Sequence, residues 1–450
     1  MTGTRESDAR TPAPFGTSRK GGRAKRAASG PREVPKGARI NSMDKEALGL
    51  VGEGSFGCVF APPIKCTGPA KALRKGAPEH SPGVKGANGA AGLVSKVFFD
   101  KTDYSNELRT SREVAKIDPS GDLMLIPNSR CDTTREAVLK HPAGYLCEKH
   151  SEYPEVSLTQ TLHQFIMPNG GVRLDHYIAD AAAAEGAGAL TPKQLLAVMM
   201  PVLEGIAALV INRRCHQDIK TSNILVAAAR KGSVYEKIAA EHNMREVARI
   251  IDYSLMIPLS DVYAAANRRR WKFSYFPYPP EYKMFNYIYN ALGPGAGAGA
   301  VAAAASSMKI TASASDKDAV LSEVKKNWMS FGERRGKAYY KLFGAAKIRE
   351  AVGDTFAWLA TAESRAKLEK ALAPFAEKLD VYSLGMVFVD VTRHVSLAGY
   401  PHTGRWMRAF RAFVRGMAHP DPRARLSADE ALASARELMV MHVRAAERAA

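Results

Sequence analysis

The chain of 450 residues is long enough for about two to three domains, and its hydrophobic fraction of 46% is ordinary for a globular protein. No run of about 18 apolar, uncharged residues occurs, so a helix that spans a membrane is not expected. The net charge of +19 is unusually high, and much of it lies near the N-terminus.

Residues 1–42 are expected to form a disordered basic tail. The first 40 of them carry ten lysines and arginines against three acidic residues, and they contain few large apolar side chains. Such a segment cannot bury enough apolar surface to offset the entropy cost of ordering. The tail is either a solvated extension or a binding segment for a polyanion, such as nucleic acid, an acidic protein or an anionic membrane surface.

An intracellular protein of the cytoplasm or nucleus is expected. The first 30 residues lack the apolar stretch of a signal peptide, and the basic run 19–26 resembles a nuclear targeting signal. The five cysteines are scattered and odd in number: Cys58, Cys66, Cys131, Cys147 and Cys215. This pattern favours free thiols in a reducing compartment, and the lack of CxxC spacing argues against a zinc site.

The first part of the chain is expected to be rich in strands. Residues 47–60 read as a strand, a glycine turn and a strand, and residues 62–92 read as a flexible insertion rich in Pro, Gly, Ala and Lys. The apolar run 92–99 predicts a further strand. A helix is expected over 104–117, ended by Asp118-Pro119, and another apolar run ends at Asn169.

The second part is expected to be mainly helical. A long helix is predicted over 192–214, and short strands are predicted over 223–226 and 247–256. Residues 291–305 are low-complexity Gly/Ala sequence, whereas 316–378 look helical and polar and 379–391 predict a buried helix. Strands followed by helices indicate an α+β fold in two lobes.

A glycine-rich segment, GEGSFGCV, occupies residues 52–59. Glycines let a backbone approach phosphates closely and donate N–H groups to them. A dinucleotide-binding loop would need a helix directly after it, but residues 58–60 read as a strand. The remaining interpretations are a phosphate-binding hairpin and a purely structural glycine hairpin.

Lys96 lies inside an apolar strand, where a charged side chain needs a partner. It either extends along an edge strand to solvent or reaches the phosphates of a bound nucleotide. In the second case its partner is a glutamate of the next helix. Glu107 and Glu113 are both candidates, with the helix length favouring Glu107.

The segment HQDIKTSN at residues 216–223 is the most specific motif in the chain. Asp218 can accept a proton from a hydroxyl, Lys220 can neutralise phosphate charge, and the Asn223 oxygen can bind a metal. Asp252 follows a buried strand, where it is either a rigidly held magnesium ligand or an ordinary turn residue.

Together these motifs resemble the eukaryotic-type protein kinase family of the serine/threonine type. Further matches are Pro279-Pro280-Glu281 to the family's A-P-E segment, Asp380 to the buried aspartate that supports the catalytic loop, and Arg425 to the arginine that pairs with the A-P-E glutamate. The motifs span residues 52–432 in the family's order. The insertion, the MPNGG segment and the PPE spelling are most similar to kinases encoded by large nucleocytoplasmic DNA viruses, which adds packaging in a virion as a possible location.

The resemblance implies a two-lobed protein-kinase fold with a small β-rich N-lobe and a larger, mainly α C-lobe. The N-lobe would cover residues 43–168 with the insertion 62–92, and the C-lobe 169–450 with a long insertion at 282–378. The implied activity is transfer of the γ-phosphate of ATP to Ser or Thr of protein substrates by a monomer that uses Mg²⁺ or Mn²⁺. The implied site residues fall into three groups: catalytic Asp218, Lys220, Lys96 and Glu107; ATP-binding Gly52, Glu53, Gly54, Ser55, Phe56, Gly57, Val59, Lys96 and Met167; and metal-binding Asn223 and Asp252.

Three departures from the family pattern carry expectations of their own. Gln217 replaces the usual arginine that binds an activation-loop phosphate, which suggests activity without that phosphorylation. Ser254 replaces a glycine after Asp252 and is expected to restrict movement of this segment. Pro168 lacks an N–H in the expected hinge, so an adenine contact is expected to be lost or to shift to Met167.

Serine/threonine specificity rests on Lys220 and on Ser274, which resemble the family's pattern. Arg268, Arg269 and Arg270 are expected either to bind an acidic group or to form a solvated loop. Two rival functions stay open: a pseudokinase that acts as an ATP-binding scaffold, and a kinase-fold phosphotransferase for small molecules. A pseudokinase predicts loss of Lys96, Asp218, Asn223 or Asp252, all of which are present.

Overall fold

The computed structural model describes ten stretches of the chain: 45, 47–54, 57–73, 92–148, 157–183, 190–264, 278–292, 333–396, 400 and 404–441. Several expectations fall outside them. These are the basic tail, the Gly/Ala tract beyond residue 292, and the residues Ser55, Phe56, Arg268, Arg269, Arg270 and Ser274.

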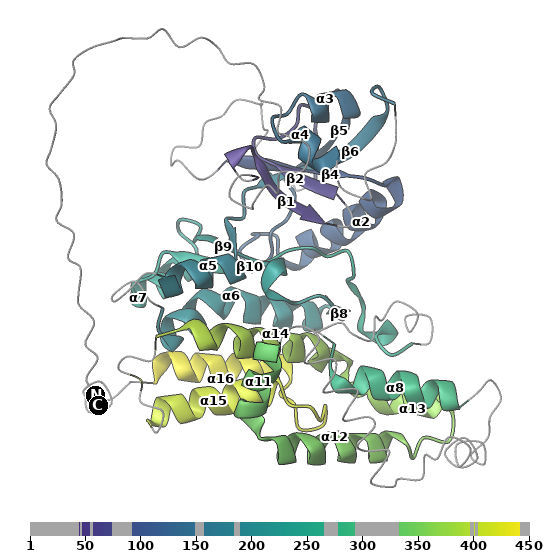
Figure 1. Ribbon diagram of the computed structural model, residues 1–450, viewed down its shortest axis with the longest axis vertical. Helices are drawn as coiled ribbons and strands as arrows, with labels where there is room; N and C mark the ends of the chain where they lie inside the picture. Colours follow the sequence, from purple (N-terminus) through teal and green to yellow (C-terminus); the bar gives the residue numbers. More distant parts are fainter. Residues whose placement is uncertain are drawn as a thin grey trace, which may run out of the picture.

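A six-stranded antiparallel sheet forms the N-terminal part, at the top of Figure 1. Its spatial order is β1-β2-β4-β6-β5-β3. The strands are β1 (Leu50–Gly54), β2 (Gly57–Phe60), β3 (Lys71–Ala72), β4 (Leu93–Phe98), β5 (Ser129–Thr134) and β6 (Thr161–Pro168). Helix α2 (Lys101–Ile117) packs against β4 and β6, and the short helices α3 (Arg135–Leu139) and α4 (Gly144–Glu148) complete this part.

Local sequence explains the start and the end of α2. The Asp100 side chain accepts hydrogen bonds from the backbone N–H groups of Thr102 and Asp103, which satisfies two donors that the first turn leaves unpaired. The helix ends at Ile117, before Asp118-Pro119, as predicted. It begins three residues earlier than the expected Tyr104 because the Asp100 cap allows the polar first turn to form.

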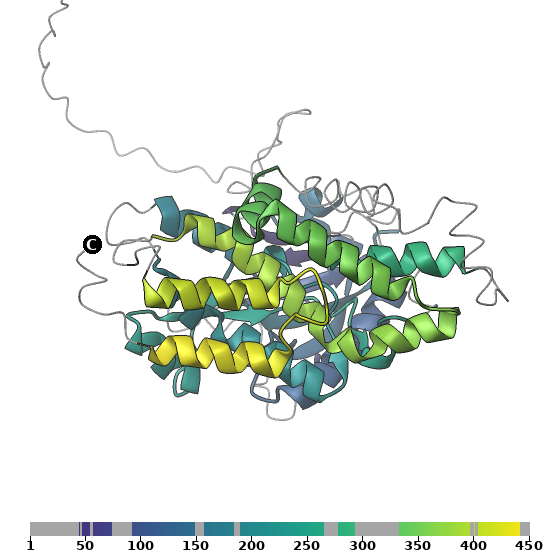
Figure 2. The ribbon, with the colours of Figure 1, turned by 90° about the horizontal axis from the view of Figure 1, so that it is seen from below.

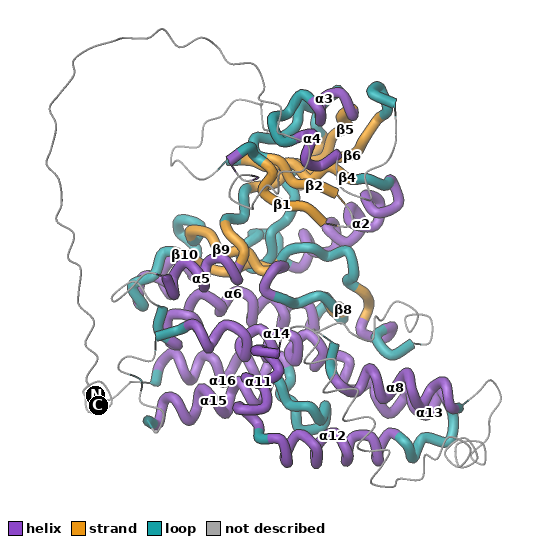
Figure 3. The backbone as a smooth tube through the Cα atoms, viewed as in Figure 1, coloured by secondary structure: helices purple, strands orange, loops and turns teal. Residues whose placement is uncertain are grey.

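The remainder of the described chain is mainly helical, and Figure 3 shows strands concentrated at one end and helices at the other. Two helices lie at the centre of its core: α6 (Pro192–Ile211), begun by a capping box of Thr191 and Gln194, and α14 (Leu379–Val391), whose residues are all buried. Around them lie α5 (Leu174–Ala183), α7 (Val234–Glu241), α8 (Pro280–Ala291), α11 (Glu333–Phe343), α12 (Ala345–Leu359), α13 (Arg365–Leu372), α15 (Arg405–Met417) and α16 (Ala428–Val440). The α+β class predicted from the sequence is therefore correct.

Two small sheets lie between these parts. One contains β7 (Val172–Arg173), β9 (Ile224–Ala228) and β10 (Glu246–Ile250), and the other pairs β8 (Arg214–Cys215) with β11 (Ile257–Pro258). Ile250 is opposite Ile224 in the antiparallel register. This register brings the loop between β8 and β9 beside the segment that follows β10.

The helical expectation for 316–378 is correct over 333–378, where the chain forms α11, α12, α13 and a short 3₁₀ helix (Ala373–Lys378). These helices are an integral part of the helical body (Figure 2). Tyr339 of α11 is fully buried, and its hydroxyl donates to the carbonyl of Ala418 at 2.9 Å. Arg365 donates from Nε to the carbonyl of Tyr289 in α8 at 3.0 Å.

The expectation of free thiols is wrong for four of the five cysteines. Cys58 is bonded to Cys147 and Cys66 to Cys131, which leaves Cys215 as the one free cysteine, buried in the core. The partners lie 89 and 65 residues apart in sequence, so their proximity arises only when the sheet forms.

The expected flexible insertion at 62–92 is also corrected in its first part. Lys71 and Ala72 pair with β5, and Cys66 is tied to the same strand through Cys131. Residues 74–91 lie outside the described chain.

Among the described helices, α6 is long and apolar enough to cross a membrane by length and composition. However, 72% of its apolar window is buried inside the protein. Its neighbours include α16, α7 and β10, so α6 is a core helix of the body.

Candidate active site

Lys96 of β4 forms an ion pair with Glu107 of α2, with 2.5 Å between Nζ and Oε2. Both side chains are largely buried, at 15% and 7% exposure. The structure thus resolves the choice between the two glutamates, because Glu113 contacts Arg214 instead. The pair lies opposite Val59 of the glycine hairpin, which is the β2 neighbour of Lys96 in the sheet.

Asp252 adds a second negative charge near Lys96. Burial alone lowers the pKa of Lys96, but the nearby carboxylates of Glu107 and Asp252 outweigh this effect and raise the pKa overall. Burial likewise raises the pKa of Asp252, while the charge of Lys96 and a hydrogen bond from Ser254 bring it below its usual value. Both groups are therefore charged at neutral pH.

The loop 216–223 holds its polar side chains together around Asp218. Lys220 Nζ donates to Asp218 Oδ2 at 3.0 Å, and Asn223 Nδ2 donates to the same oxygen at 2.8 Å. Asn223 Nδ2 also donates to the backbone carbonyl of Asp218 at 3.0 Å. Asp218 is only 4% exposed, so its carboxylate is fixed in one orientation by these two donors.

Asp380 of α14 holds the start of this loop through two hydrogen bonds. Its carboxylate accepts the backbone N–H of His216 at 2.6 Å and that of Gln217 at 2.9 Å. The buried His216 ring lies between the loop and β10: Nδ1 accepts from the Asp218 N–H at 3.2 Å, and Nε2 lies 3.1 Å from the carbonyl of Ile251. This pattern places the ring proton on Nε2.

Backbone strain marks both sides of the site. Gln217 has φ of +66° and Asp252 has φ of +65°, in the left-handed region that non-glycine residues rarely adopt. Such strain persists where the surroundings fix it, and it is concentrated at functional sites. Here the Asp380 bonds fix Gln217, and a hydrogen bond of 2.7 Å from Ser254 Oγ to Oδ1 fixes Asp252.

The segment Asp252-Tyr253-Ser254 is anchored on three sides. The buried hydroxyl of Tyr253 lies 2.7 Å from the carbonyl of Ile250 and 3.2 Å from that of Leu125. The Ile251 N–H donates to the Asn223 carbonyl at 3.0 Å, which brings Asp252 beside Asn223. The bond from Ser254 to Asp252 gives a physical basis for the restricted movement that was expected of this segment. The hydrogen bonds of the Tyr253 hydroxyl restrict the segment further.

The glycine hairpin covers the same region of the sheet. Gly52 lies opposite Val59, Glu53 opposite Cys58 and Gly54 opposite Gly57. A Cβ atom at Gly57 would lie 2.0 Å from the carbonyl oxygen of Val97, so no other residue fits this close approach of two strands. The hairpin tip, Ser55 and Phe56, is outside the described residues.

Met167 lies at the end of β6, opposite Val94 of β4. Its half-buried side chain and the following Pro168 are on the strand that leaves the sheet toward the helical body. The Asn169 N–H donates to the carbonyl of Gly92 at 2.9 Å, so the chain stays paired with β4 up to this point. Met167 and Lys96 are therefore on neighbouring strands.

A second layer of contacts links the loop to α8. Gln217 Nε2 donates to the Tyr282 hydroxyl at 3.2 Å, and both side chains are buried. The neighbouring Glu281 forms a two-pronged ion pair with Arg425 at 2.6 and 2.9 Å. The pairing of Glu281 with Arg425 was expected from the sequence. No local sequence pattern indicated the Gln217–Tyr282 hydrogen bond or the Arg214–Glu113 ion pair.

The residues fit a divalent metal bound together with phosphates. The described part of the chain has no group of three or more His, Cys, Asp or Glu side chains that could hold a metal ion alone. Asn223 and the ionised Asp252 are adjacent, and both side-chain hydrogen bonds of Asn223 noted above use Nδ2, so Oδ1 is the atom suited to a metal. Magnesium commonly takes one or two protein oxygens and completes its shell with phosphate and water.

The site therefore combines Lys96, which is paired with Glu107 on the sheet side, with four side chains on the side of the helical body: the carboxylates of Asp218 and Asp252, the amide of Asn223 and the ammonium group of Lys220. This arrangement can hold a polyphosphate and accept a proton from a hydroxyl. No model of a known protein family matches the chain, and a search of curated proteins finds no similar sequence.

Proposed function

We propose that the chain is a serine/threonine protein kinase with a two-lobed kinase fold, which transfers the γ-phosphate of ATP to protein substrates. The observation that carries the proposal is the buried Lys96–Glu107 pair with Asp252 close to it. The Asp218–Lys220–Asn223 cluster is joined to Asp252 through the bond from the Ile251 N–H to the Asn223 carbonyl. These groups supply the phosphate clamp, the metal ligands and the proton acceptor that phosphoryl transfer needs.

In this mechanism Lys96 binds the α- and β-phosphates, and Glu107 keeps its ammonium group in place. Asp218 accepts the proton of the substrate hydroxyl, and Lys220 and Asn223 hold the carboxylate by its Oδ2 atom. Lys220, whose Nζ lies 3.0 Å from Asp218, would also compensate charge on the transferred phosphate. Asn223 and Asp252 would hold the divalent metal, which when bound neutralises phosphate charge.

The glycine hairpin would cover the phosphates through its backbone N–H groups, contributed by residues 52–59. Met167 would contact the adenine at the end of β6, because Pro168 lacks an N–H. A protein rather than a small molecule is the proposed substrate, since the Pro279-Pro280-Glu281 segment and Arg425 resemble the residues that frame the protein-substrate groove in the kinase family. The proposed relationship to kinases of large nucleocytoplasmic DNA viruses rests on the sequence resemblance alone.

The test is transfer of radiolabelled phosphate from ATP–Mg²⁺ to casein, histone and myelin basic protein, with Asp218→Asn as the matched variant. Asn keeps the shape of Asp218 but cannot accept the proton, so transfer is expected to fall at least 100-fold. Label on serine or threonine that disappears in the variant supports the proposal. ATP binding without transfer to any protein favours the scaffold function, and transfer only to small molecules favours the small-molecule phosphotransferase.

A further inference from the structure

Helix α2 carries two glutamates that point to different sides. Glu107 faces Lys96 in the sheet, whereas Glu113 faces Arg214 of β8 in the helical body. Six residues of α-helix rotate a side chain by about 240°, so the two carboxylates lie about 120° apart around the helix axis. The helix therefore bridges the two parts of the molecule through one ion pair on each side.

The Glu113–Arg214 contact reaches the strand that leads into the catalytic loop. Arg214 Nε donates to Glu113 Oε2 at 2.9 Å, and both side chains are about a quarter exposed. Arg214 comes two residues before His216 and lies opposite Pro258 of β11. A displacement of α2 would therefore move Arg214 and, with it, the loop that contains Asp218.

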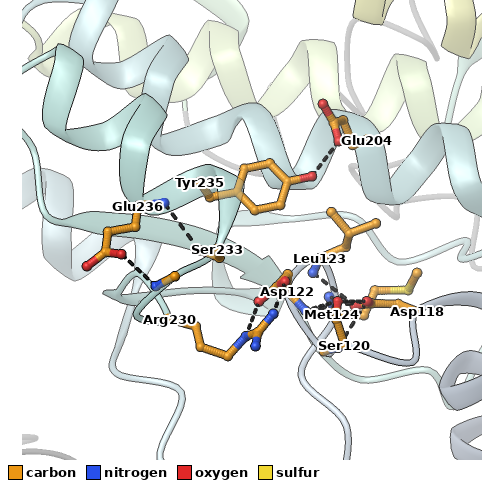
Figure 4. A network of polar contacts seen from close by, with 12 residues as sticks. Asp118, Ser120, Asp122, Leu123, Met124, Glu204, Arg230, Ser233, Tyr235 and Glu236 are labelled. Atoms are coloured by element: carbon orange, nitrogen blue, oxygen red, sulfur yellow. Dashed lines mark hydrogen bonds and ion pairs between the residues drawn. The ribbon is translucent and has the colours of Figure 1, made fainter.

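The segment after α2 is fixed to the same body, as Figure 4 shows. The Asp118 carboxylate accepts the backbone N–H groups of Leu123 and Met124 at 2.9 Å each. Arg230, which follows β9, donates two hydrogen bonds of 2.7 and 2.6 Å to the Asp122 carboxylate. The C-terminal end of α2 is therefore anchored, and the Glu113–Arg214 ion pair adds a contact between the helix itself and the strand that precedes the loop.

We infer that Glu113 and Arg214 are a positioning pair, which holds α2 in the orientation that lets Glu107 reach Lys96. This inference rests on the proposed function for its catalytic consequence, but not for its structural one. The pair links β8 to α2 by charges that the chain itself supplies. Formation of the Lys96–Glu107 pair would then need no phosphorylated residue and no activating partner.

The first measurement is hydrogen–deuterium exchange on the full chain, comparing wild type with Arg214→Ala. An ion pair of this exposure changes the equilibrium constant for local opening of a helix by at most about fivefold. The exchange rate of the α2 amides is therefore expected to increase by roughly threefold to fivefold in the variant. Exchange in α16 should not change. Arg109→Ala is the matched control, because Arg109 also faces Glu113, at 3.4 Å, but lies on α2 itself and cannot tie the helix to the body.

The double variant Glu113→Arg, Arg214→Glu restores the pair with reversed charges and should return α2 exchange to near wild type. Unchanged α2 exchange in Arg214→Ala would overturn the inference, and so would an equal increase in α16, which indicates only a loss of global stability. Failure of the swap to restore α2 exchange counts against it as well.

Kinetics then separate this inference from the proposed function. If the wild type transfers phosphate, Arg214→Ala should lower kcat/KM for ATP by up to about fivefold. The same substitution in a Glu107→Ala background should have no further effect, because the pair acts through Glu107. If the wild type transfers no phosphate, the proposed function fails, while the exchange experiment still decides whether the pair positions α2.

Discussion

Arg425 and Glu281, 144 residues apart in sequence, form a two-pronged ion pair whose side chains have no exposed surface. The Arg425 guanidinium also lies 4.7 Å from the ring of Tyr382, and its Nε donates to the carbonyl of His419. Every direction from which water would reach the pair is closed by protein. The pair joins the start of α8 to the segment before α16.

Glu281→Ala is expected to destabilise the protein by about 3–5 kcal/mol, because it leaves a buried guanidinium without its counter-charge. Urea denaturation of wild type and variant measures the difference. Glu430→Ala is a suitable control, since that glutamate is an exposed helix-capping residue near the same region. A loss under 1 kcal/mol for Glu281→Ala would show that the pair is dispensable.

Asp380→Asn is expected to lower activity more than tenfold while the chain stays folded. An amide offers one oxygen in place of two, so the N–H of His216 or that of Gln217 loses its acceptor and the strained loop relaxes. The check is kcat alongside circular dichroism. Ser383→Ala, one turn along α14, tests whether any change in this helix has the same effect; equal kcat in Asp380→Asn and wild type contradicts the supporting role.

Removal of phosphate from the purified protein should leave its activity unchanged within about twofold. Gln217 is neutral and bonded to Tyr282, so it offers no charge that could bind a phosphorylated residue. Activity is compared after treatment with active and with heat-inactivated phosphatase, and mass spectrometry verifies removal. A tenfold drop with the active enzyme alone would mean that another basic group takes the place of an arginine at 217.

The two disulfides predict a simple thiol count. Protein unfolded without reductant should react with one equivalent of a thiol reagent, from Cys215, and with five after reduction. Reduction should also lower the free energy of unfolding by about 2–4 kcal/mol for each bond. Cys215→Ser serves as the control, because it should abolish the single thiol without altering the effect of reductant; five thiols before reduction would disprove both bonds.

Local chemistry explains why much of the site could be predicted from sequence. Asp218, Lys220 and Asn223 occupy one short loop, so their spacing alone indicates that they meet. Lys96 needed a partner for burial, which limited the choice to glutamates of the next helix. Which glutamate it was depends on the rotation of α2, and that is set by packing and by Arg214, 101 residues away from Glu113.

The features that sequence reasoning missed are all non-local. The disulfides join cysteines whose spacing matches no known motif, and the sheet order brings them together only after folding. The same holds for the bond between Gln217 and Tyr282, 65 residues apart. By contrast, the α+β order of elements and the burial of α14 follow from apolar patterns within single segments, and these predictions were correct.

The fully buried Tyr339 has a practical meaning for anyone who wishes to shorten the chain. The helices between α8 and α14 lie within the insertion that the family pattern predicts at 282–378. Yet Tyr339 fills the core beneath α14, and its hydroxyl satisfies the carbonyl of Ala418. Deletion of residues 333–378 would remove the Tyr339 ring from beneath the helix that carries Asp380 and leave the Ala418 carbonyl without this donor, so a shortened chain must retain α11.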